Sequence, residues 1–312
     1  MKAVGFTEFG GPEVLHLVDL PDPQARPGEV RIRVHAAAVN PTDTGLRSGA
    51  RAQLLKDIPP PYVPGMDVAG VVDQVGPGFQ ADLAVGDRVM GIVVPRGSHG
   101  GYSELVVLPA DSVVRVPAGA SDAAAATLPM NGLTTQQALD LLDLQPGQTL
   151  AVTGAAGAVG GYAIQLGTAA GLRVVADAAE QDEQLVLDLG AEIVVRRGED
   201  FAAQVRAAVP DGADGLIDAA LLNEVVVPAV RDGGKIATVR GFTGEEVRGI
   251  TFHPVTVRTY ARERGKLDRL RQQAEAGEIT LRVARTLAAA QAADAHRILE
   301  AGGTRGRLVL EF

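Results

Sequence analysis

The stretch Thr149-Leu-Ala-Val-Thr-Gly-Ala-Ala-Gly-Ala-Val-Gly-Gly161 decides the fold class of this chain. It reads as an apolar strand, a glycine-rich turn and the start of a helix. The helix that it begins has an apolar face that can pack against a sheet. That face is formed by residues at helical spacing, namely Val159, Ala163, Leu166 and Ala170. The order of strand, turn and helix predicts the first βα unit of a dinucleotide-binding domain.

Three glycines of this turn have separate expected roles. Gly154 allows a tight turn, Gly157 lets the backbone approach a pyrophosphate, and Gly160 lets the helix and the strand pack closely. Helix N–H groups then face the phosphate charge. Ala155 stands where the usual G-x-G-x-x-G pattern has its first glycine. The residues that we expect to bind the cofactor here are Gly154, Ala155, Ala156, Gly157, Ala158, Val159 and Gly160. The alternatives are a purely structural turn or a site for another nucleotide-type ligand.

An acidic residue follows at the distance that ribose binding requires. Asp177 ends the next predicted strand, 20 residues after Gly157, where a carboxylate can accept hydrogen bonds from the adenosine ribose. On this argument alone, Asp177 favours NAD over NADP.

The sequence has two regions with different secondary-structure patterns, and this predicts two domains. Residues 1–120 contain short β-prone runs broken by Gly and Pro, whereas residues 121–257 alternate strands with helical segments, as in βαβ units around a parallel sheet. The strands expected in the second region are 149–153, 173–176, 192–195, 215–218 and 235–239, and its helices include 158–170, 181–189 and 201–209. In residues 258–312 we expect helices at 262–275 and 287–299 and a last strand at 307–312.

Composition narrows the kind of partner. A net charge of −9 disfavours a nucleic-acid surface, because phosphate binding requires clustered Lys and Arg, so a small molecule fits better. The sequence contains no cysteine, which excludes disulfides and thiolate metal sites and suits a reducing compartment. The five histidines show no metal-type spacing, so we expect them at the surface or in packing roles. With no apolar signal core and no long apolar stretch, we expect a cytoplasmic protein without membrane contact.

Several further motifs, in order along nearly the whole chain, resemble the zinc-free quinone oxidoreductase branch of the medium-chain dehydrogenase/reductase superfamily. They are Ala38-Val-Asn-Pro-Thr-Asp43, Arg47-Ser-Gly49, Pro64-Gly-Met-Asp-Val-Ala-Gly70, Val85-Gly-Asp-Arg-Val89, Gly100-Gly-Tyr-Ser-Glu104, Leu128-Pro-Met-Asn-Gly-Leu-Thr134 and Gly303-Thr-Arg-Gly-Arg307. The resemblance implies an α/β protein with a GroES-like β-rich catalytic domain at 1–120, completed by about 258–312. It also implies a doubly wound Rossmann domain at 121–257 and a cleft shared by the two.

The resemblance also implies that no metal is bound. Zinc-dependent members of the superfamily carry a Cys ligand where Asn40 stands, and a Gly-His-Glu where this chain has Gly65-Met66-Asp67. Reduction of a simple ketone needs a Lewis acid or a proton donor to stabilise the alkoxide. A quinone or an enone differs, because its negative charge delocalises and hydrogen bonds can suffice. We therefore expect hydride transfer from the nicotinamide C4 to a quinone or to the β-carbon of an activated alkene, with the proton from solvent or a hydroxyl.

Residue roles follow from the same resemblance. Asn40 is expected near the nicotinamide ribose, and Thr127 and Asn131 near the nicotinamide or the substrate. Asp43 and Tyr62 are candidates for lining the cleft, although Asp43 could equally cap a turn and Tyr62 could simply be packed. The segment Gly241, Phe242 and Thr243 should offer backbone groups to the carboxamide.

Two features of the sequence favour different cofactors, NADH and NADPH. The family mostly prefers NADPH, held by polar or basic residues after the second strand, whereas this chain has Asp177 and further acids there. Arg196 and Arg197 end the third strand, where relatives contact the adenosine phosphate, and Arg suits that group. The alternative is two solvated arginines at a strand end. Family grounds lead us to expect NADPH rather than NADH.

Other functions remain open at this point. They are an NADPH-binding protein without turnover, as in lens-crystallin relatives, a zinc-independent alcohol or aldehyde reductase, a zinc alcohol dehydrogenase and a Rossmann-type methyltransferase. The segment 250–260 is rich in β-branched residues and follows the last Rossmann strand, where relatives join their sheets edge to edge. We therefore expect a homodimer.

Overall fold

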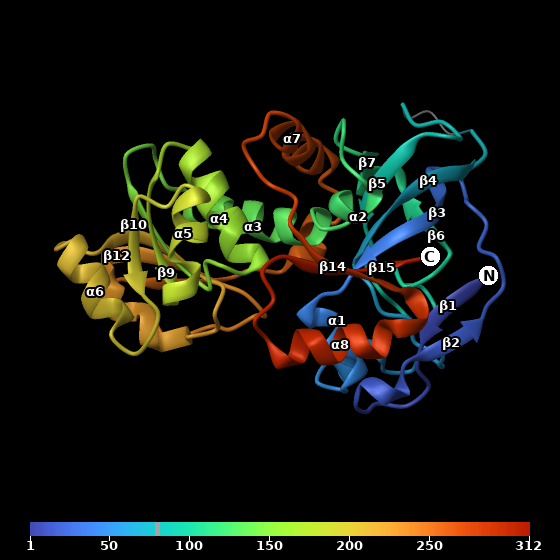
Figure 1. Ribbon diagram of the computed structural model, residues 1–312, viewed down its shortest axis with the longest axis horizontal. Coiled ribbons are helices and arrows are strands. Elements are labelled where there is room, and N and C mark those ends of the chain that lie inside the picture. Colours follow the sequence, from blue (N-terminus) through green and yellow to red (C-terminus); the bar gives the residue numbers. More distant parts are fainter. Residues whose placement is uncertain (79–81) are drawn as a thin grey trace. The chain divides into compact units, whose positions relative to one another are not determined.

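The protein forms two compact units in a computed structural model that describes residues 1–78 and 82–312. The first unit contains Met1–Met130, Ala261–Ala276 and Leu281–Phe312, and the second contains Asn131–Tyr260 and Gly277–Thr280. Figure 1 labels their helices and strands. The α/β class with a GroES-like unit and a Rossmann-type unit is confirmed.

The first unit is built on a seven-stranded sheet. Its strands are β3 (Glu29–Ala38), β4 (Asp67–Val75), β5 (Arg88–Ile92), β6 (Leu105–Pro109), β7 (Val113–Arg115), β14 (Val283–Ala288) and β15 (Arg307–Glu311), beside a two-stranded sheet of β1 (Lys2–Gly5) and β2 (His16–Asp19). Strand β15 pairs antiparallel with β3, with Val309 opposite Ala38. The C-terminal residues therefore complete the sheet that the N-terminal residues begin.

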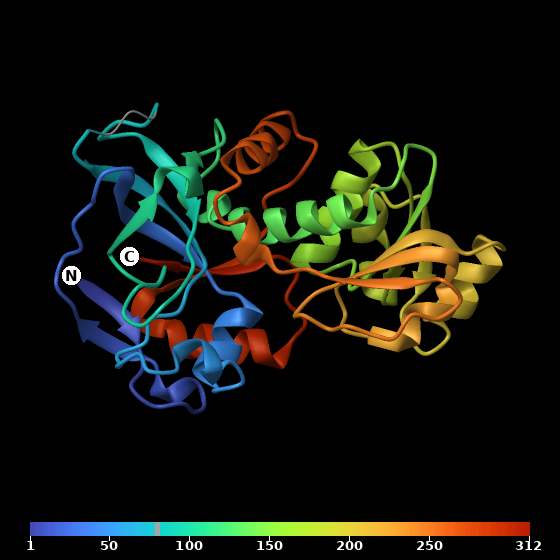
Figure 2. The same cartoon turned by 180° about the vertical axis from the view of Figure 1, so that it is seen from behind.

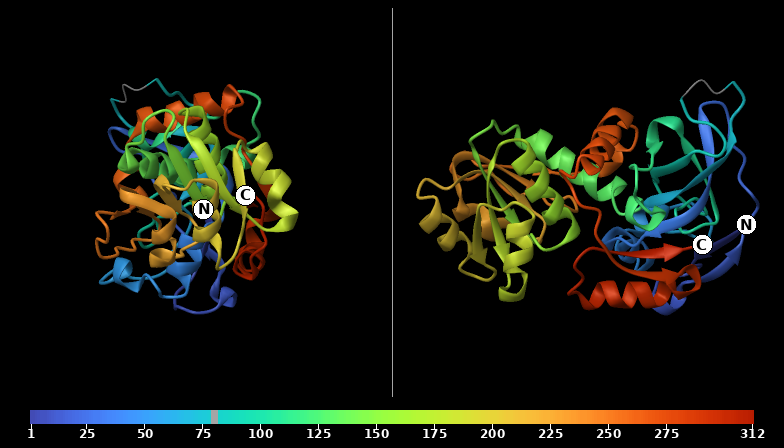
Figure 3. Two further views of the ribbon diagram at one scale, coloured as in Figure 1. Left: turned by 90° about the vertical axis from the view of Figure 1, so that its left-hand side faces the viewer. Right: turned by 45° about the horizontal axis from the view of Figure 1, so that its top comes forward.

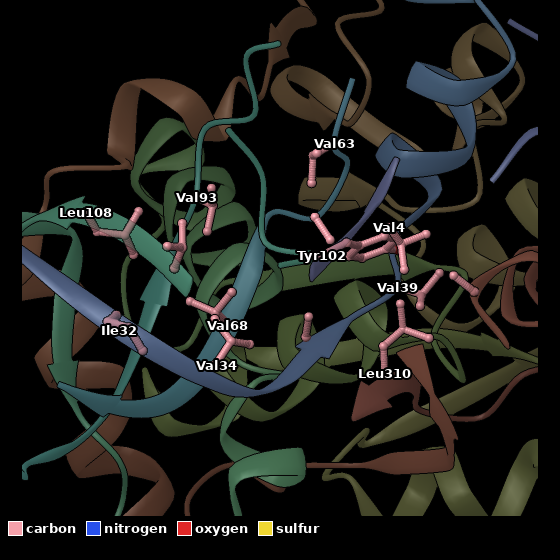
Figure 4. Packing of buried hydrophobic residues seen from close by; sticks show 14 of the residues in the cluster. Val4, Ile32, Val34, Val39, Val63, Val68, Val93, Tyr102, Leu108 and Leu310 are labelled. Carbon is pink, nitrogen blue, oxygen red and sulfur yellow. The ribbon is translucent and has the colours of Figure 1, made fainter. Parts of the chain in front are cut away.

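Buried apolar side chains at alternate positions of β3 form part of the core of this unit. Val30, Ile32 and Val34 are buried at every second position, as a half-buried strand requires. They pack in one cluster with Tyr102, which precedes β6, and with Leu310 of β15 (Figure 4).

In its described residues, the first unit contains four complete α-helices. They are α1 (Pro41–Arg47), α2 (Asp122–Ala125), α7 (Arg264–Glu275) and α8 (Ala292–Ala301). Helices α1 and α8 lie side by side in Figures 1 and 2. The sequence pattern places α2 in the other domain, because the alternation of strands and helices is expected from residue 121. It belongs to the first unit because Asp122 is held by His35 of β3 and Arg88 of β5.

The second unit is built on a six-stranded sheet in which every neighbouring pair is parallel. Its strands are β8 (Thr149–Thr153), β9 (Arg173–Ala178), β10 (Ile193–Arg196), β11 (Ala213–Asp218), β12 (Val230–Thr238) and β13 (Thr251–Pro254). The spatial order of the strands is β10-β9-β8-β11-β12-β13. From β8 the chain first adds strands on one side, β9 and β10, and then adds β11, β12 and β13 on the other side, so the order of the strands switches between β8 and β11. In open parallel sheets, ligands bind outside the carboxyl ends of the strands at this switch point.

Helices cover both faces of the parallel sheet. They are α3 (Pro129–Leu142), which begins in the first unit, α4 (Ala158–Ala169), α5 (Glu183–Asp188) and α6 (Phe201–Ala208). Leu150 and Val152 of β8 pack with α3, α4 and α5, while Ala151 packs with α6, so α4 and α6 lie on opposite faces (Figure 3). Short 3₁₀ helices are found at Pro12–Val14, Ala52–Leu55, Ala110–Ser112, Glu180–Asp182, Asn223–Ala229, Val257–Tyr260 and Ala289–Gln291.

One expected helix was wrong in its first half. Residues 287–299 were expected to be helical because they are rich in alanine, but β14 runs to Ala288 and α8 begins only at Ala292. Leu287 is paired with Leu310 in a parallel ladder, so tertiary sheet pairing overrides the helix propensity of alanine.

Candidate functional site

The glycine-rich turn after β8 has the close packing that the sequence predicted. Gly154 has a φ of +65°, a left-handed conformation that favours glycine. A Cβ on Gly160 would lie 2.3 Å from the carbonyl oxygen of Gly154 and 2.7 Å from the Cα of Ala155. Helix α4 can therefore approach the turn this closely only with glycine at position 160.

Gly157 differs from the other two glycines. It precedes α4 with a φ of −73°, and among the described atoms around it a Cβ would meet only the Gly154 carbonyl oxygen, at 3.0 Å. Packing therefore restricts the side chain at position 157 less than at position 160, and space is left beside the first turn of α4. The first N–H groups of a helix have no acceptor within that helix, so Ala158 and Val159 direct donors to this place.

Asp177 has protein partners that the sequence did not predict. The residue is 2% exposed, and its carboxylate accepts the N–H of Ala155 at 2.9 Å and the Nε–H of Arg197 at 3.0 Å. One expected phosphate donor, the Ala155 amide, is therefore used inside the protein. Asp177 fastens the glycine-rich turn to the end of β9, and its charge is matched by Arg197.

A second fastening joins the strands at the switch point. Thr153, the last residue of β8, donates its hydroxyl to Asp218, the last residue of β11, over 2.7 Å. The N–H of Ala220 donates to the Thr153 hydroxyl and the N–H of Asn223 donates to Asp218, so the loop after β11 is held as well. Sequence analysis missed Asp218, although its place at the end of an apolar strand was a usable signal.

Two further groups of expected cofactor residues belong to the second unit: Gly241, Phe242 and Thr243 follow β12, and Arg196 ends β10. Gly241 has a φ of +81°, and the carbonyl oxygen of Phe242 accepts the Thr238 hydroxyl at 2.6 Å, which fixes the turn that also contains Thr243. Arg196 is exposed and lies 3.4 Å from a Glu180 carboxylate oxygen.

Asn40 and Asp43 lie together in the first unit. Asn40 precedes α1, and its backbone N–H donates to Asp43 at 2.8 Å, so Asp43 closes the start of the helix. Asp43 also accepts the N–H of Gly65 at 3.0 Å and the hydroxyl of Tyr102 at 3.2 Å. The capping alternative for Asp43 is thus realised in the structure.

Asn40 has a further buried partner, Asp67. Its side-chain amide donates to Asp67 over 2.7 Å, and the other carboxylate oxygen of Asp67 accepts the N–H of Met130 at 2.6 Å. Asn40 and Asp67 are fully buried. Asp67, Tyr102 and His296 were not predicted as site residues, although Asp67 and Tyr102 lie within the quoted motifs Pro64–Gly70 and Gly100–Glu104.

Burial shifts the ionisation of this cluster. It raises the pKa of Asp43 to about 6 and the pKa of Asp67 to about 7, against opposing hydrogen bonds and the charge of Arg307. Burial also raises the pKa of Tyr102 well above its usual value and lowers the pKa of His296, which lies 3.2 Å from the Tyr102 hydroxyl, to about 3. Two carboxyl groups therefore change protonation near neutral pH, while Tyr102 and His296 stay uncharged.

Tyr62, Thr127 and Asn131 have other surroundings. The Tyr62 ring stacks on Phe9, with centroids 6.0 Å apart, and its hydroxyl donates to the carbonyl oxygen of Ile58 at 2.9 Å. Thr127 is buried and donates its hydroxyl to the carbonyl oxygen of Ala124. Asn131 is fully buried near the start of α3.

Residues 1–78 and 82–312 lack two further kinds of feature. There, no group of three or more His, Cys, Asp or Glu side chains is arranged to hold a metal ion. No helix in those ranges is both long and apolar enough to span a membrane.

Comparison with known families agrees with this architecture. The alcohol dehydrogenase GroES-like domain matches residues 26–118, and the zinc-binding dehydrogenase family matches residues 189–310. The chain is 35% identical to quinone oxidoreductase of Mus musculus over 77% of this chain and 73% of the relative. It is 30% identical to quinone oxidoreductase of Pseudomonas aeruginosa over 99% of both. It is 31% identical to the chloroplastic NADPH-dependent alkenal/one oxidoreductase of Arabidopsis thaliana, over 77% of this chain and 63% of that enzyme.

Solved structures are similar over the whole chain. An NAD-dependent alcohol dehydrogenase has a TM-score of 0.89 and 32% identity, with all of both chains covered. A mycobacterial protein complexed with NADPH has a TM-score of 0.86 and 28% identity, again with all of both chains covered. Fold and sequence together define an oxidoreductase of the medium-chain dehydrogenase/reductase superfamily. Within it, the chain belongs to the quinone oxidoreductase branch, and the expected family is confirmed.

The glycine-rich turn gives the first prediction. Gly160→Ala should lower the free energy of unfolding by about 2 kcal/mol or more, because its Cβ would collide with main-chain atoms. The matched control Gly157→Ala should cost less than about 1 kcal/mol, because its Cβ would meet one atom, at 3.0 Å, and a shift of a few tenths of an ångström relieves that contact. Urea unfolding measures both, and equal losses would contradict the packing argument.

Proposed function

We propose that this protein reduces a quinone or an activated alkene with NADPH and without a metal ion. The observation that carries the proposal is the hydrogen bond from the Asn40 side chain to Asp67, at positions where zinc-dependent members of the superfamily carry metal ligands. An amide nitrogen that donates its proton is no zinc ligand, and the thioether of Met66 is a poor one. The donor set therefore does not fit zinc.

The second unit fits a nicotinamide dinucleotide. The space beside Gly157 and the leading N–H groups of Ala158 and Val159 suit a diphosphate at the N-terminus of α4. The turn from Gly241 to Thr243 would hold the carboxamide, with Asn40, Thr127 and Asn131 toward the nicotinamide end. When bound, the cofactor supplies a hydride from its nicotinamide C4.

The chain's own groups suit an acceptor that spreads its charge. Asn40 and Thr127 are neutral and buried, so they can orient an acceptor but bring no positive charge to an alkoxide. Enolates and hydroquinones delocalise the charge, and hydrogen bonds then suffice. Tyr62 would form an aromatic wall, because its hydroxyl is already bonded to Ile58. Asp43 would position Asn40 through its backbone N–H.

One further activity has a specific observation behind it. The similar NAD-dependent alcohol dehydrogenase structure favours a zinc-independent alcohol or aldehyde reductase as the second candidate.

The lack of cysteine suits a reducing compartment, and a cytoplasmic location is part of this proposal.

The activity is tested by following NADPH oxidation at 340 nm with quinones, enones and simple aldehydes, with and without a chelator, alongside metal analysis. We expect turnover with quinones or enones that the chelator leaves unchanged. Turnover restricted to aldehydes would favour the second candidate, and tight binding of NADPH without any oxidation would favour a non-catalytic protein. Loss of turnover on chelation would contradict the metal-free mechanism.

The preference for NADPH rests on Arg197. An open carboxylate at the end of β9 would repel a 2′-phosphate, but Asp177 is buried and paired with the Arg197 Nε. The Arg197 side chain is 42% exposed, so its remaining N–H groups can reach a phosphate. Asp177, which by itself favours NADH, thus pairs with Arg197, an arginine that suits the 2′-phosphate of NADPH.

Substituting Arg197 and Arg196 one at a time tests which arginine determines the preference for NADPH. Arg197→Gln should lower the ratio of kcat/KM for NADPH over NADH by about tenfold or more, because a charged hydrogen bond to phosphate is lost. Arg196→Gln, the matched control at a more exposed position, should change the ratio by about threefold at most. An NADH preference in the unsubstituted protein, or an unchanged ratio in Arg197→Gln, would refute the assignment.

The homodimer remains part of the proposal. Strand β13 is the last strand of the parallel sheet, and such an edge can pair with a second copy of the chain. Light scattering at micromolar concentration should then give about twice the chain mass of 32.2 kDa. A mass of one chain under these conditions would count against edge pairing.

A further inference from the structure

Helices α1 and α8 of the first unit are joined by two polar bridges. In the first bridge, the Tyr102 hydroxyl lies 3.2 Å from Asp43 of α1 and 3.2 Å from Nε2 of His296 of α8. In the second, Nη2 of Arg47 donates to Glu300 of α8 over 2.5 Å. Asp43 and Arg47 lie four residues apart on α1, as do His296 and Glu300 on α8, and residues at that spacing are neighbours on one helix face. The two bridges therefore lie side by side, about one helical turn apart.

Each bridge contains a buried side chain that is only partly hydrogen-bonded. Nε and Nη1 of Arg47 and Nδ1 of His296 are buried and have no hydrogen-bond partner on residues 1–78 and 82–312. Arg47 is 3% exposed and His296 is fully buried. Leaving such groups unsatisfied is costly, and more so for a charged donor. These three atoms therefore require a partner that the protein itself does not supply.

The first bridge determines whether Nδ1 of His296 is a donor or an acceptor. The Asp43 carboxylate has only acceptors, so the single hydroxyl proton of Tyr102 is donated to it. The Tyr102 oxygen can then only accept from His296, whose Nε2 must carry a proton. His296 is uncharged, because burial and then the nearby Arg47 charge lower its pKa to about 3. A neutral imidazole has one N–H, so Nδ1 is an acceptor.

We propose that one buried water molecule binds between the two bridges, where it accepts a hydrogen bond from Arg47 and donates one to Nδ1 of His296. Water can take both roles at once, and buried waters in proteins satisfy polar groups of this kind. Arg47 and His296 form no direct hydrogen bond with each other through these atoms, so a bridging molecule is required to join them. This inference goes beyond the proposed function and does not depend on it.

An anion suits this position less well than water does. The Arg47 charge is already matched by the carboxylate of Glu300, with which it forms an ion pair of 2.5 Å. The lone pair of His296 Nδ1 would face the anion and repel it, whereas it attracts a proton of water. A buried charge without a full set of partners is costly. The charge balance therefore favours a neutral ligand that both donates and accepts.

The water molecule would extend the hydrogen bonds that support Asp43. From Arg47 the chain passes through the water to His296, then to Tyr102 and Asp43. The Asp43 carboxylate in turn accepts the backbone N–H of Asn40, which precedes α1. Arg47 would thus support the start of its own helix through α8.

A high-resolution crystal structure of the unsubstituted, cofactor-free protein tests the site directly. We expect an ordered water within about 3.2 Å of His296 Nδ1 and of Nε or Nη1 of Arg47. A direct hydrogen bond between the two side chains, or the absence of density between them, would overturn the proposal. Crystals soaked in bromide test for an anion, and an anomalous peak at this position would overturn it as well.

Two variants test which side chain holds the water. Arg47→Met removes the donors and keeps a long side chain, so the water should be lost. Glu300→Gln is the matched control, because the amide oxygen of glutamine can still accept from Arg47, and the water should remain. A water that persists in Arg47→Met, or that disappears in Glu300→Gln, would contradict the assignment to Arg47.

The tautomer of His296 provides a test that needs neither crystals nor a variant. Long-range ¹H–¹⁵N NMR spectra at about pH 8, where Asp43 with its pKa of about 6 is ionised, should show a proton on Nε2 and none on Nδ1. A proton on Nδ1 would refute the inference, even if Arg47→Met failed to fold. Failure to oxidise NADPH would instead refute the proposed function and would leave these outcomes unchanged.

Discussion

The approach of helix α4 to the turn after β8 is the contact on which the proposed cofactor site depends. Only glycine at position 160 permits it, because any Cβ would meet the Gly154 carbonyl oxygen at 2.3 Å. The contact brings the N-terminus of α4 to the switch point of the sheet, where donors and a helix dipole can meet a diphosphate. Asp177 and the Thr153–Asp218 pair then hold the turn from two neighbouring strands. The turn is thus preorganised, and little ordering should be required when a ligand binds.

The first unit meets a different constraint, since it buries polar side chains where zinc-dependent relatives place a metal. Burying a carboxylate is costly unless hydrogen bonds compensate. Asp43 accepts two backbone N–H groups and Asp67 accepts one, and each also accepts a side-chain donor, from Tyr102 and Asn40 respectively. The compensation is incomplete, which is why both groups keep raised pKa values. A cluster of this kind holds Asn40 in place.

Local patterns predicted the second unit better than the first. The bounds of β8 and the roles of Gly154 and Gly160 could be read from apolar runs and glycine spacing, because both depend on residues close in sequence. The Asp43–Tyr102–His296 connection could not, because its members are separated by 59 and 194 residues. The same reason explains the error at Leu287, whose partner Leu310 lies in a later strand. Asp177 was recognised as important, but its bond to Ala155 depends on the folded turn.

If the proposed cofactor site is correct, the main-chain donors at the start of α4 bind a diphosphate. The most direct measurement is the electron density at this turn in crystals soaked with NADPH. We predict phosphate oxygens within hydrogen-bonding distance of the N–H groups of Ala158 and Val159, with the Asp177–Ala155 bond intact. A turn that stays empty at saturating cofactor, or that holds a ligand lacking a diphosphate, would contradict the account.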